Sequence, residues 1–486
     1  MKRLLGIILG SLAIALVYIL ANLLLFSSKQ SDIEKIAPIK VTNAAPQHLS
    51  DAIKIKTISY DDPAMIDTAS FHQFIELLYE KYPVAFGKME YTFLGGMTML
   101  FKWQGKRTDL KPMILMSHYD VVPVPEANLS EWKEPPFSGL IKNGEIWGRG
   151  AIDDKVGVIG IMEAVEMLIS SGFQPDRTVY LSFGHDEEIM GINGAKQVAH
   201  YLKQKGVKAE FVLDEGGYIT QGLVPGMQKD VALIGTTEKG FVTLELNVDV
   251  EGGHASMPKK ETAIDVLSKA IGKINENPFP SYISKPLNDF IDYVGPEMPL
   301  GFRTVFANAT LLEPVLMAVY EKAPSSNALV RTTVAPTIIE AGEKNNVLPT
   351  YARAVLNIRI LPEESVNSVH EDLKEVIDDE RVKIKILEKS EPASISNPDH
   401  PTYVMLDKSI KQVFGDIVIS PYIMIAASDS RYFSKVSDHI YRFCPFKLNK
   451  QNIKSFHGIN EKIGVEEFKD CVRFYHQLIK NGATEM

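Results

Sequence analysis

Residues that could hold metal ions recur along this chain in well-separated stretches. In chain order they are His118, Asp120, Asp153, Asp154, Glu187, Glu188, Asp214 and His457. Imidazole and carboxylate groups are ligands that suit zinc, and such a site needs no thiolate. The adjacent Glu187 and Glu188 can divide the work, because one can bind metal while the other stays free as a base. The set therefore has the composition that metal-assisted hydrolysis requires.

The residues that precede these candidates predict how they are brought together. Short apolar or β-branched runs predict strands that end just before His118, Glu187 and Asp214, at 113–116, 178–183 and 211–213. Helical spacing of apolar residues follows at 156–170 and 195–204. This alternation predicts an α/β sheet covered by helices on both faces. Ligands gather at the carboxyl ends of strands in such sheets, so we expect these side chains to meet there.

The chain changes character after residue 235. An alternating strand over 240–250 and a second strand within 345–361 flank a helical pattern over 262–274. We therefore expect an α+β insert at about 236–392, between the two parts of the catalytic domain at 51–235 and 393–486. The middle of the insert, 275–335, has many prolines and little periodicity, and we expect an insertion within the insert there.

The N-terminus has the pattern of a membrane anchor. Lys2 and Arg3 precede an uncharged apolar run over 4–26, which at ~1.5 Å per residue can cross a ~30 Å hydrocarbon core. We expect residues 1–26 to form an uncleaved single-pass anchor and 27–50 a polar tether. The alternative is a cleaved signal peptide, but its Ala-x-Ala spacing at 13–15 lies inside the apolar run. The positive-inside rule puts the catalytic body on the extracytoplasmic side, which is the periplasm in a Gram-negative bacterium.

Composition excludes some classes of protein. The 486 residues are 45% hydrophobic, which is ordinary for a globular chain of about two domains. A net charge of -9 without a basic stripe argues against a nucleic-acid partner. Cys444 and Cys471 could pair in an oxidising compartment or stay buried as free thiols, so they do not decide the compartment.

Six motifs in a fixed order make the chain resemble the M20 family of metallopeptidases and amidohydrolases. They are MSHYDVVP at 116–123, WGRGAIDDK at 147–155, GHDEE at 184–188, LDEG at 213–216, GHAS at 253–256 and HG at 457–458. Within the family, FGHDEE at 183–188 and the long insert are most similar to the carboxypeptidase S and N-acyl-amino-acid hydrolase branch. The resemblance implies a catalytic domain with a mixed sheet flanked by helices, and an inserted α+β lid or dimerisation domain.

The resemblance also implies two zinc ions in each active site. Asp153 would bridge the two ions. His118 and Asp214 would complete one site, and Glu188 and His457 would complete the other. Two such ions, ~3.5–4 Å apart, lower the pKa of a shared water and polarise the carbonyl that is attacked.

Other acidic residues near the ligands have different expected roles. The resemblance makes Glu187 the general base, which takes a proton from the water and gives it to the leaving amine. Asp120 would orient His118 by accepting its second N–H. We expect Asp154 to cap the following helix, and Glu215 is the alternative to Asp214 as a ligand.

Substrate recognition is assigned by the same resemblance. Arg359 would bind the substrate carboxylate, for which a guanidinium is suited, and an exposed strand arginine is the alternative. Asn346 would bind the same end of the substrate. His254 would donate a hydrogen bond to the developing oxyanion. It would come from the neighbouring subunit, as in dimeric relatives, or from the same chain, as in monomeric members.

These expectations together describe a zinc-dependent hydrolase that cleaves the amide bond beside a C-terminal free amino acid. Its partners would be a small-molecule or peptide substrate with a free carboxylate, the membrane and, in a homodimer, a second copy. N-acyl amino acids and small peptides both fit, and phenylalanines in the insert at 279, 290, 302 and 306 suit a hydrophobic acyl group. The alternative is a catalytically silent, membrane-anchored binding protein of the same fold, which the retention of Glu187 and all five ligands disfavours. A dimetal phosphoesterase is disfavoured because no Arg/Lys cluster surrounds the acidic residues.

Overall fold

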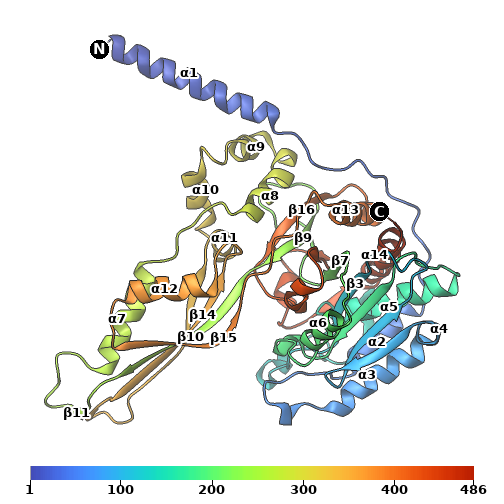
Figure 1. Ribbon diagram of the computed structural model, residues 1–486, viewed down its shortest axis with the longest axis horizontal. Helices are drawn as coiled ribbons and strands as arrows, with labels where there is room; N and C mark the ends of the chain where they lie inside the picture. The colour runs from blue at the N-terminus through green and yellow to red at the C-terminus, as the bar shows by residue number, and fades with distance from the viewer. Residues whose placement is uncertain (1, 486) are drawn as a thin grey trace.

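A ten-stranded mixed sheet forms the centre of the computed structural model, which describes residues 2–485 (Figure 1). Its β3 pairs in parallel with β6 and β7, whereas β2 joins β6 antiparallel. The mixed sheet expected from the sequence is therefore confirmed. In spatial order the strands are β1 (Glu90–Leu94), β2 (Thr98–Trp103), β6 (Val179–Gly184), β3 (Met113–His118), β7 (Phe211–Asp214), β17 (Ile440–Arg442), β9 (Val231–Glu238), β8 (Ile219–Thr220) and β18 (Lys447–Leu448), with β16 (Val418–Met424) beside β9.

Helices cover both faces of this sheet because alternate strand residues point to opposite sides. In β3, Met113 and Leu115 enter the core under one group of helices, and Ile114 and Met116 enter the core under α6 (Ala195–Gln204). The first group is α2 (Ala45–Lys54), α3 (Thr68–Lys81), α4 (Pro83–Lys88), α5 (Lys155–Ser170), α13 (Pro401–Phe414) and α14 (Val465–Gly482). A small sheet of β4 (Ile141–Lys142), β5 (Glu145–Trp147) and β19 (Lys462–Gly464) lies apart from the large one.

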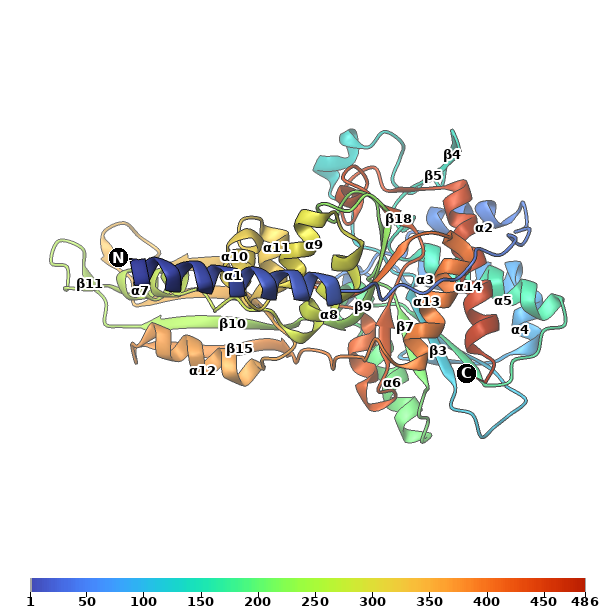
Figure 2. The same ribbon diagram turned by 90° about the horizontal axis from the view of Figure 1, so that it is seen from above.

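The lid is a separate four-stranded antiparallel sheet that projects from the body (Figures 1 and 2). Its strands are β12 (Thr333–Ala341), β14 (Tyr351–Ile360), β10 (Gly240–Asp249) and β15 (Val382–Ser390), in that order. Helices α7 (Ala263–Glu276) and α12 (Val366–Ile377) pack on the sheet around a core of its own. The tip carries the short pair β11 (Gly253–His254) and β13 (Val347–Leu348). The α+β insert is thus confirmed as a fold.

The middle of the insert is helical, which the sequence analysis did not predict. It contains α8 (Lys285–Val294), α9 (Leu300–Ala307), α10 (Glu313–Tyr320) and α11 (Pro324–Val330). The prolines that suggested irregular chain stand in the first turns of α8, α10 and α11, where a missing N–H costs nothing. This helical subdomain, residues 285–330, shares a core with β9 and β16 of the large sheet.

The N-terminal helix α1 (Lys2–Leu25) protrudes from the molecule, and its apolar run over Arg3–Leu25 is not buried (Figure 1). Residues 26–44 have no regular helix or strand but are held against the body. Gln30, for example, exchanges hydrogen bonds with the backbone of Ile419 in both directions. Cys444 and Cys471 are both buried and free, which settles the alternative that the sequence left open.

Candidate metal centre

Asp153 lies between two imidazoles at the carboxyl edge of the large sheet. Its Oδ1 is 3.2 Å from Nε2 of His118, and its Oδ2 is 3.1 Å from Nε2 of His457. The same His457 nitrogen is 3.2 Å from Oε2 of Glu188. His118, Asp153 and Glu188 each offer a ligand atom, all within 4.8 Å of one another. A carboxylate whose oxygens face different imidazoles has the geometry to serve two cations.

Strand order explains how these residues meet. His118 is the last residue of β3, and Glu187 and Glu188 begin the turn after the neighbouring β6. Asp153 precedes α5 directly, whereas His457 comes from a loop more than 300 residues later, with φ +51. The expectation that strand ends would gather metal-capable side chains holds for these positions.

The charge of the cluster fits bound cations. Burial raises the pKa of Glu187 well above its usual value, and nearby Asp429 and Glu188 raise it further. Hydrogen bonds to Asp153 and Glu188 raise the pKa of His457 to about 10. Oε1 of Glu188 is buried and has no hydrogen-bond partner within residues 2–485. The cluster thus contains several buried carboxylates, and one of their oxygens has no partner. Carboxylate and imidazole groups are ligands that zinc uses, so these side chains could bind it.

Asp120 links the imidazole of His118 to the glutamate pair. Its Oδ1 lies 3.3 Å from Nδ1 of His118, and its two oxygens accept the backbone N–H groups of Glu187 and Glu188 at 3.1 Å each. Ser59 donates to the same carboxylate at 2.6 Å. Burial would raise the pKa of Asp120, but these hydrogen bonds, led by that of His118, hold it below its usual value. The backbone oxygen of Asp120 also lies 3.1 Å from Nδ1 of His118, so two acceptors compete for that proton.

Asp214 ends β7 beside β3, and its carboxylate is held by backbone groups. Its two oxygens accept the N–H of Glu215 at 3.0 Å and that of Ser430 at 2.7 Å. The side chain of Glu215 forms no hydrogen bond in the described part of the chain. Burial, followed by the charges of Glu187 and Asp153, raises the pKa of Glu215 well above its usual value. Among the described residues, the carboxylate of Asp214 bonds to these two backbone groups and not to the cluster, whereas the charges of Glu187 and Asp153 act on Glu215, so these contacts do not decide between the two as a ligand.

Arg431 approaches the cluster, although the sequence analysis did not select it. Its Nη2 donates to Oε1 of Glu187 at 3.3 Å, and its side chain is almost fully buried. The same short segment supplies the Ser430 N–H to Asp214, and Ser428 bonds to Glu238 at 3.1 Å. The only signal of this role in the sequence is the SDSR segment at 428–431.

A buried ion pair that the sequence analysis missed connects the Asp153 and His457 loops. Nη1 of Arg149 donates to Oε2 of Glu461 at 2.6 Å, and its Nη2 donates to the carbonyl of Gly458 at 2.8 Å. Oε1 of Glu461 accepts the N–H groups of Gly150 and Ile152 at 2.9 Å. The GRG motif therefore fixes the loop that carries His457, and the late position of Glu461 gave no signal of this contact.

Asp154 takes the N-cap position of α5, as expected, but its side chain does not cap the helix. Its carboxylate accepts the hydroxyl of Ser117 instead. Burial raises the pKa of Asp154 to about 7. The expectation of a capping carboxylate is wrong because the adjacent β3 supplies a closer donor.

Arg359 lies near the base of the lid, on β14 opposite Phe241 of β10. Its guanidinium carbon is 5.6 Å from the centre of the Phe241 ring. Among residues 2–485 this side chain forms no hydrogen bond or ion pair. Burial, followed by the nearby charge of Arg431, lowers its pKa. Arg359 therefore has no ion-pair partner among the described residues, and an unpaired guanidinium suits a carboxylate ligand.

His254 belongs to β11, which Figure 1 labels at the opposite end of the lid, and Asn346 directly precedes the partner strand β13. His254 pairs with Val347 across the β11–β13 ladder, and the carbonyl of Asn346 accepts the N–H of Ala255 at 3.1 Å. The Nδ1 atom of His254 lies 2.7 Å from the hydroxyl of Ser256. Because a ten-residue strand such as β10 is roughly 33 Å long, one chain does not bring His254 to the cluster that Arg359 approaches.

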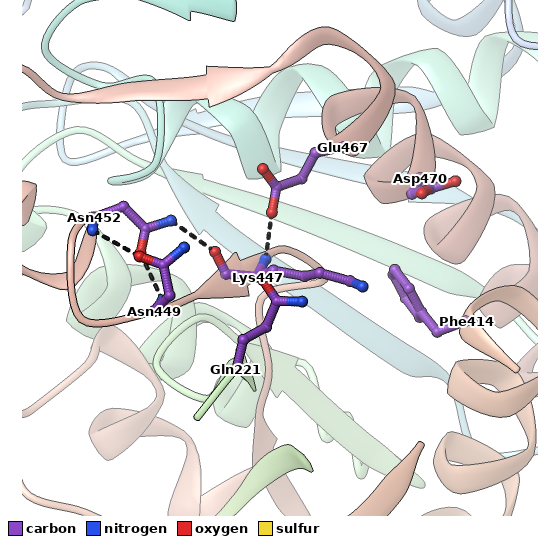
Figure 3. Close-up of a pocket in the computed structure, with 7 residues that line it drawn as sticks. All are labelled: Gln221, Phe414, Lys447, Asn449, Asn452, Glu467 and Asp470. Carbon is purple, nitrogen blue, oxygen red and sulfur yellow. Dashed lines mark hydrogen bonds between the residues drawn. The ribbon is translucent and has the colours of Figure 1, made fainter. Parts of the chain in front are cut away.

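A surface cavity of about 280 Å³ lies elsewhere on the body (Figure 3). Lys447 is at its centre, with its backbone N–H bonded to Glu467 and its carbonyl accepting from Asn452. Its ammonium group pairs with Asp230 at 3.0 Å. The polar groups of Lys447 are therefore satisfied within the protein, and none of the residues lining this cavity belongs to the metal cluster.

Comparison with known proteins agrees with this geometry. The model of peptidase family M20/M25/M40 matches residues 114–481. Probable carboxypeptidase S-like 2 of Dictyostelium discoideum is 38% identical, over 99% of this chain and 94% of that protein. N-fatty-acyl-amino acid synthase/hydrolase PM20D1 of Xenopus tropicalis is 39% identical, over 90% of this chain and 85% of that protein. A solved M20 family metallo-carboxypeptidase from Sulfolobus solfataricus has a TM-score of 0.65 at 19% identity, covering 91% of this chain and 100% of that one.

Proposed function

This chain belongs to peptidase family M20/M25/M40, and from that premise we propose a zinc-dependent hydrolase that releases a C-terminal amino acid. Membership makes the chain a metallohydrolase that acts on amide bonds. The proposal adds that the amide lies next to a free amino acid, and that the other half is a fatty acyl or peptidyl group. The observation that carries it is the position of Asp153 between His118 and His457.

Two zinc ions would share the carboxylate of Asp153. His118 and Asp214 would complete the ligands of one ion, with Glu215 as the alternative to Asp214. Glu188 and His457 would complete those of the other. Bound zinc supplies an acidified water and polarises the carbonyl of the amide.

Glu187 would be the general base. Its carboxylate accepts a proton from the attacking water, whose oxygen bonds to the carbonyl carbon, and returns it to the amine as the C–N bond breaks. Two contacts support this role. Asp120 fixes the backbone of Glu187, and Arg431 orients the carboxylate at 3.3 Å. Glu187 would therefore be held beside the metal ligand Glu188, where its carboxylate can accept the proton and return it without a change of conformation.

Arg359 would bind the carboxylate of the departing amino acid. Its guanidinium has no ion-pair partner in the described chain, and Arg431 and Lys239 add positive charge nearby. Bidentate pairing with a carboxylate would satisfy a half-buried guanidinium that otherwise has none of its N–H donors paired.

His254 and Asn346 would reach the active site of a second copy. The support is their position at the tip of the lid, away from the metal cluster of their own chain. The edge strand β12 is exposed over most of its length, including Ile338 and Ile339. An exposed apolar edge of this kind favours pairing with another chain, so we propose a homodimer joined through the lids.

The relatives favour a fatty acyl group over a peptidyl group. A relative at 39% identity is named an N-fatty-acyl-amino acid synthase/hydrolase, although one at 38% is named a carboxypeptidase.

We propose that α1 is an uncleaved anchor with the body on the extracytoplasmic side. Its apolar span of 23 residues, Arg3–Leu25, and its lack of buried residues support a bilayer as its surroundings.

A substrate panel tests the acyl assignment. Zinc-loaded full-length protein in detergent would be given N-acyl amino acids of increasing chain length and dipeptides, all with the same leaving amino acid. We expect kcat/KM to rise with the length of the acyl chain and to exceed that of the dipeptides. A preference for dipeptides would make the protein a carboxypeptidase, and cleavage of neither would contradict the proposal.

A further inference from the structure

The helical subdomain carries an apolar face that no described residue covers. On α10 and just before it, the outward positions recur at helical spacing and are Leu311, Pro314, Val315, Ala318 and Val319. Val315 is 57% exposed and Val319 56% exposed. On the neighbouring α9, Leu300 is 70% exposed and Phe302 is also exposed. We call this surface the α9–α10 face.

The α10 helix is apolar on both sides, which is unusual for a helix at a protein surface. Leu316 and Met317 point inward into the core that the subdomain shares with β9 and β16. Between Arg303 and Glu321 the only charged residue is Glu313, and its carboxylate turns inward to accept the N–H of Ile283 at 3.3 Å. A helix that is hydrophobic all round belongs in a protein core or in lipid, so its outer side requires a partner.

The partner is indicated by the point at which α1 joins the subdomain. Phe26 directly follows α1, and its ring is packed so closely that a side chain at Gly295 would come within 2.6 Å of it. Arg303 of α9 donates to the carbonyl of Phe26 at 2.8 Å. Asn308 accepts from Nδ2 of Asn22 at 2.9 Å and donates to the carbonyl of Ile19 at 3.3 Å. No flexible linker therefore separates α1 from α9.

The segment after Phe26 is also held against the subdomain and does not act as a flexible linker. Ser28 bonds to Glu297, Lys29 pairs with Asp292 at 3.2 Å, and Gln30 bonds to the carbonyl of Tyr293 at 3.1 Å. Whatever the tilt of α1, the bilayer that it enters must come close to the subdomain at Phe26.

We propose that the α9–α10 face inserts into the surface of the bilayer that α1 enters. The face would lie in the interface with its apolar side chains among the outer acyl segments, as amphipathic interfacial helices do at a depth of ~5–10 Å. This inference rests on the proposed role of α1 as a membrane helix. It goes beyond that role, because it fixes the body against the membrane instead of leaving it on a tether.

The body would then present one side to the lipid. Lys239, at the junction of β9 and β10, donates to the carbonyls of Ala328 and Arg331 at the end of α11. Its neighbour Glu238 accepts from Ser428, in the segment that reaches the metal cluster. The lipid-facing subdomain is thus connected directly to the base of the lid.

Lipid-dependent fluorescence quenching tests the proposal on the full-length protein in phosphatidylcholine vesicles. A small environment-sensitive fluorophore would be attached at Val315→Cys, and both natural cysteines are buried and should not react. Val84→Cys on α4 is the matched control, because it replaces an exposed valine at the far end of the molecule (Figure 1). Leu12→Cys reports on α1 independently. Phospholipids that carry a quencher on the acyl chain would then be introduced.

We expect loss of emission at Val315→Cys and at Leu12→Cys, and none at Val84→Cys. Quenching at Leu12→Cys alone would overturn the proposal while keeping the anchor. Quenching at Val315→Cys alone would support the lipid-facing surface and remove the anchor. No quenching at either would overturn both. A blue shift at Val315→Cys without quenching, dependent on the ratio of protein to lipid, would show that a second copy covers the face and would also overturn the proposal.

Discussion

The metal cluster and the tip of the lid differ in how completely one chain builds them. Around Asp153, each candidate ligand is held by backbone N–H groups, ion pairs or other ligands, and most of these groups are buried. At the tip of the lid, His254 is exposed, and within residues 2–485 its side chain forms hydrogen bonds only with Ser256 of its own loop. We therefore propose that one chain supplies all the metal ligands, whereas His254 meets the substrate only in the site of a second chain or after a movement of the lid.

The largest effect should come from Glu187→Gln, which removes the proposed base and leaves the buried cluster otherwise intact. Loss of a general base alone lowers kcat by ~10²–10⁴-fold. Metal analysis of the purified variant should still find two zinc ions per chain. If zinc is lost with activity, then Glu187 is a ligand and Glu188 is the base.

His254→Ala should lower kcat by ~10²–10³-fold, the usual result of removing an oxyanion donor, with the zinc content unchanged. Mixing this variant with Glu187→Gln sharpens the comparison. If His254 acts on a second copy, exchanged dimers contain one intact site and regain part of the activity. Demonstrated exchange without any recovery would mean that the lid moves within its own chain.

Arg359→Ala should raise KM for substrates with a free carboxylate, because a hydrogen bond to a charged group contributes ~1.5–3 kcal/mol. The C-terminal amides of the same substrates should be poor with either protein and almost unaffected by the change. Arg353→Ala is the matched control, since Arg353 lies on the same strand but pairs with Glu245 and Glu340. Equal losses on acids and amides would show that Arg359 acts through the fold of the lid.

Asp120→Asn should have the smallest effect, seen mainly in metal affinity. Replacing a partner of a ligating histidine typically weakens metal binding by ~10–100-fold. Competition with a chelator would measure this shift, and excess zinc should restore much of the activity. Activity that stays low at saturating zinc would indicate that Asp120 mainly orients Glu187.

The sequence predicted the parts of the site that local pattern specifies. His118, Glu187 and Glu188 follow short β-branched or apolar runs, and the end of each run marks where the strand ends. The helix before Ser170 and the alternating strand after Gly240 were predicted for the same reason and are confirmed. The local sequence pattern therefore predicts both the strands of the sheet and the candidate ligands that lie at its edge.

Contacts between distant segments could not be predicted in this way. Glu461 pairs with Arg149 across 312 positions, and Arg431 reaches Glu187 across 244. Glu461 has no local pattern that differs from that of an ordinary charged residue, and Arg431 has only the SDSR segment at 428–431. The helices α8, α10 and α11 were missed for a different reason. Each is only 7–10 residues long and has a proline at its first or second position, so the pattern resembles a loop.

The most direct test of the proposed function is the release of free amino acid from an N-acyl amino acid by the full-length protein. Three samples would be compared at equal concentration: zinc-loaded protein, protein stripped by a chelator, and zinc-loaded Glu187→Gln. The account predicts stoichiometric release of amino acid and fatty acid by the first sample only, recovered in the second when zinc returns. Release that is unchanged by the chelator or by Glu187→Gln would contradict it, and so would the absence of release from all three.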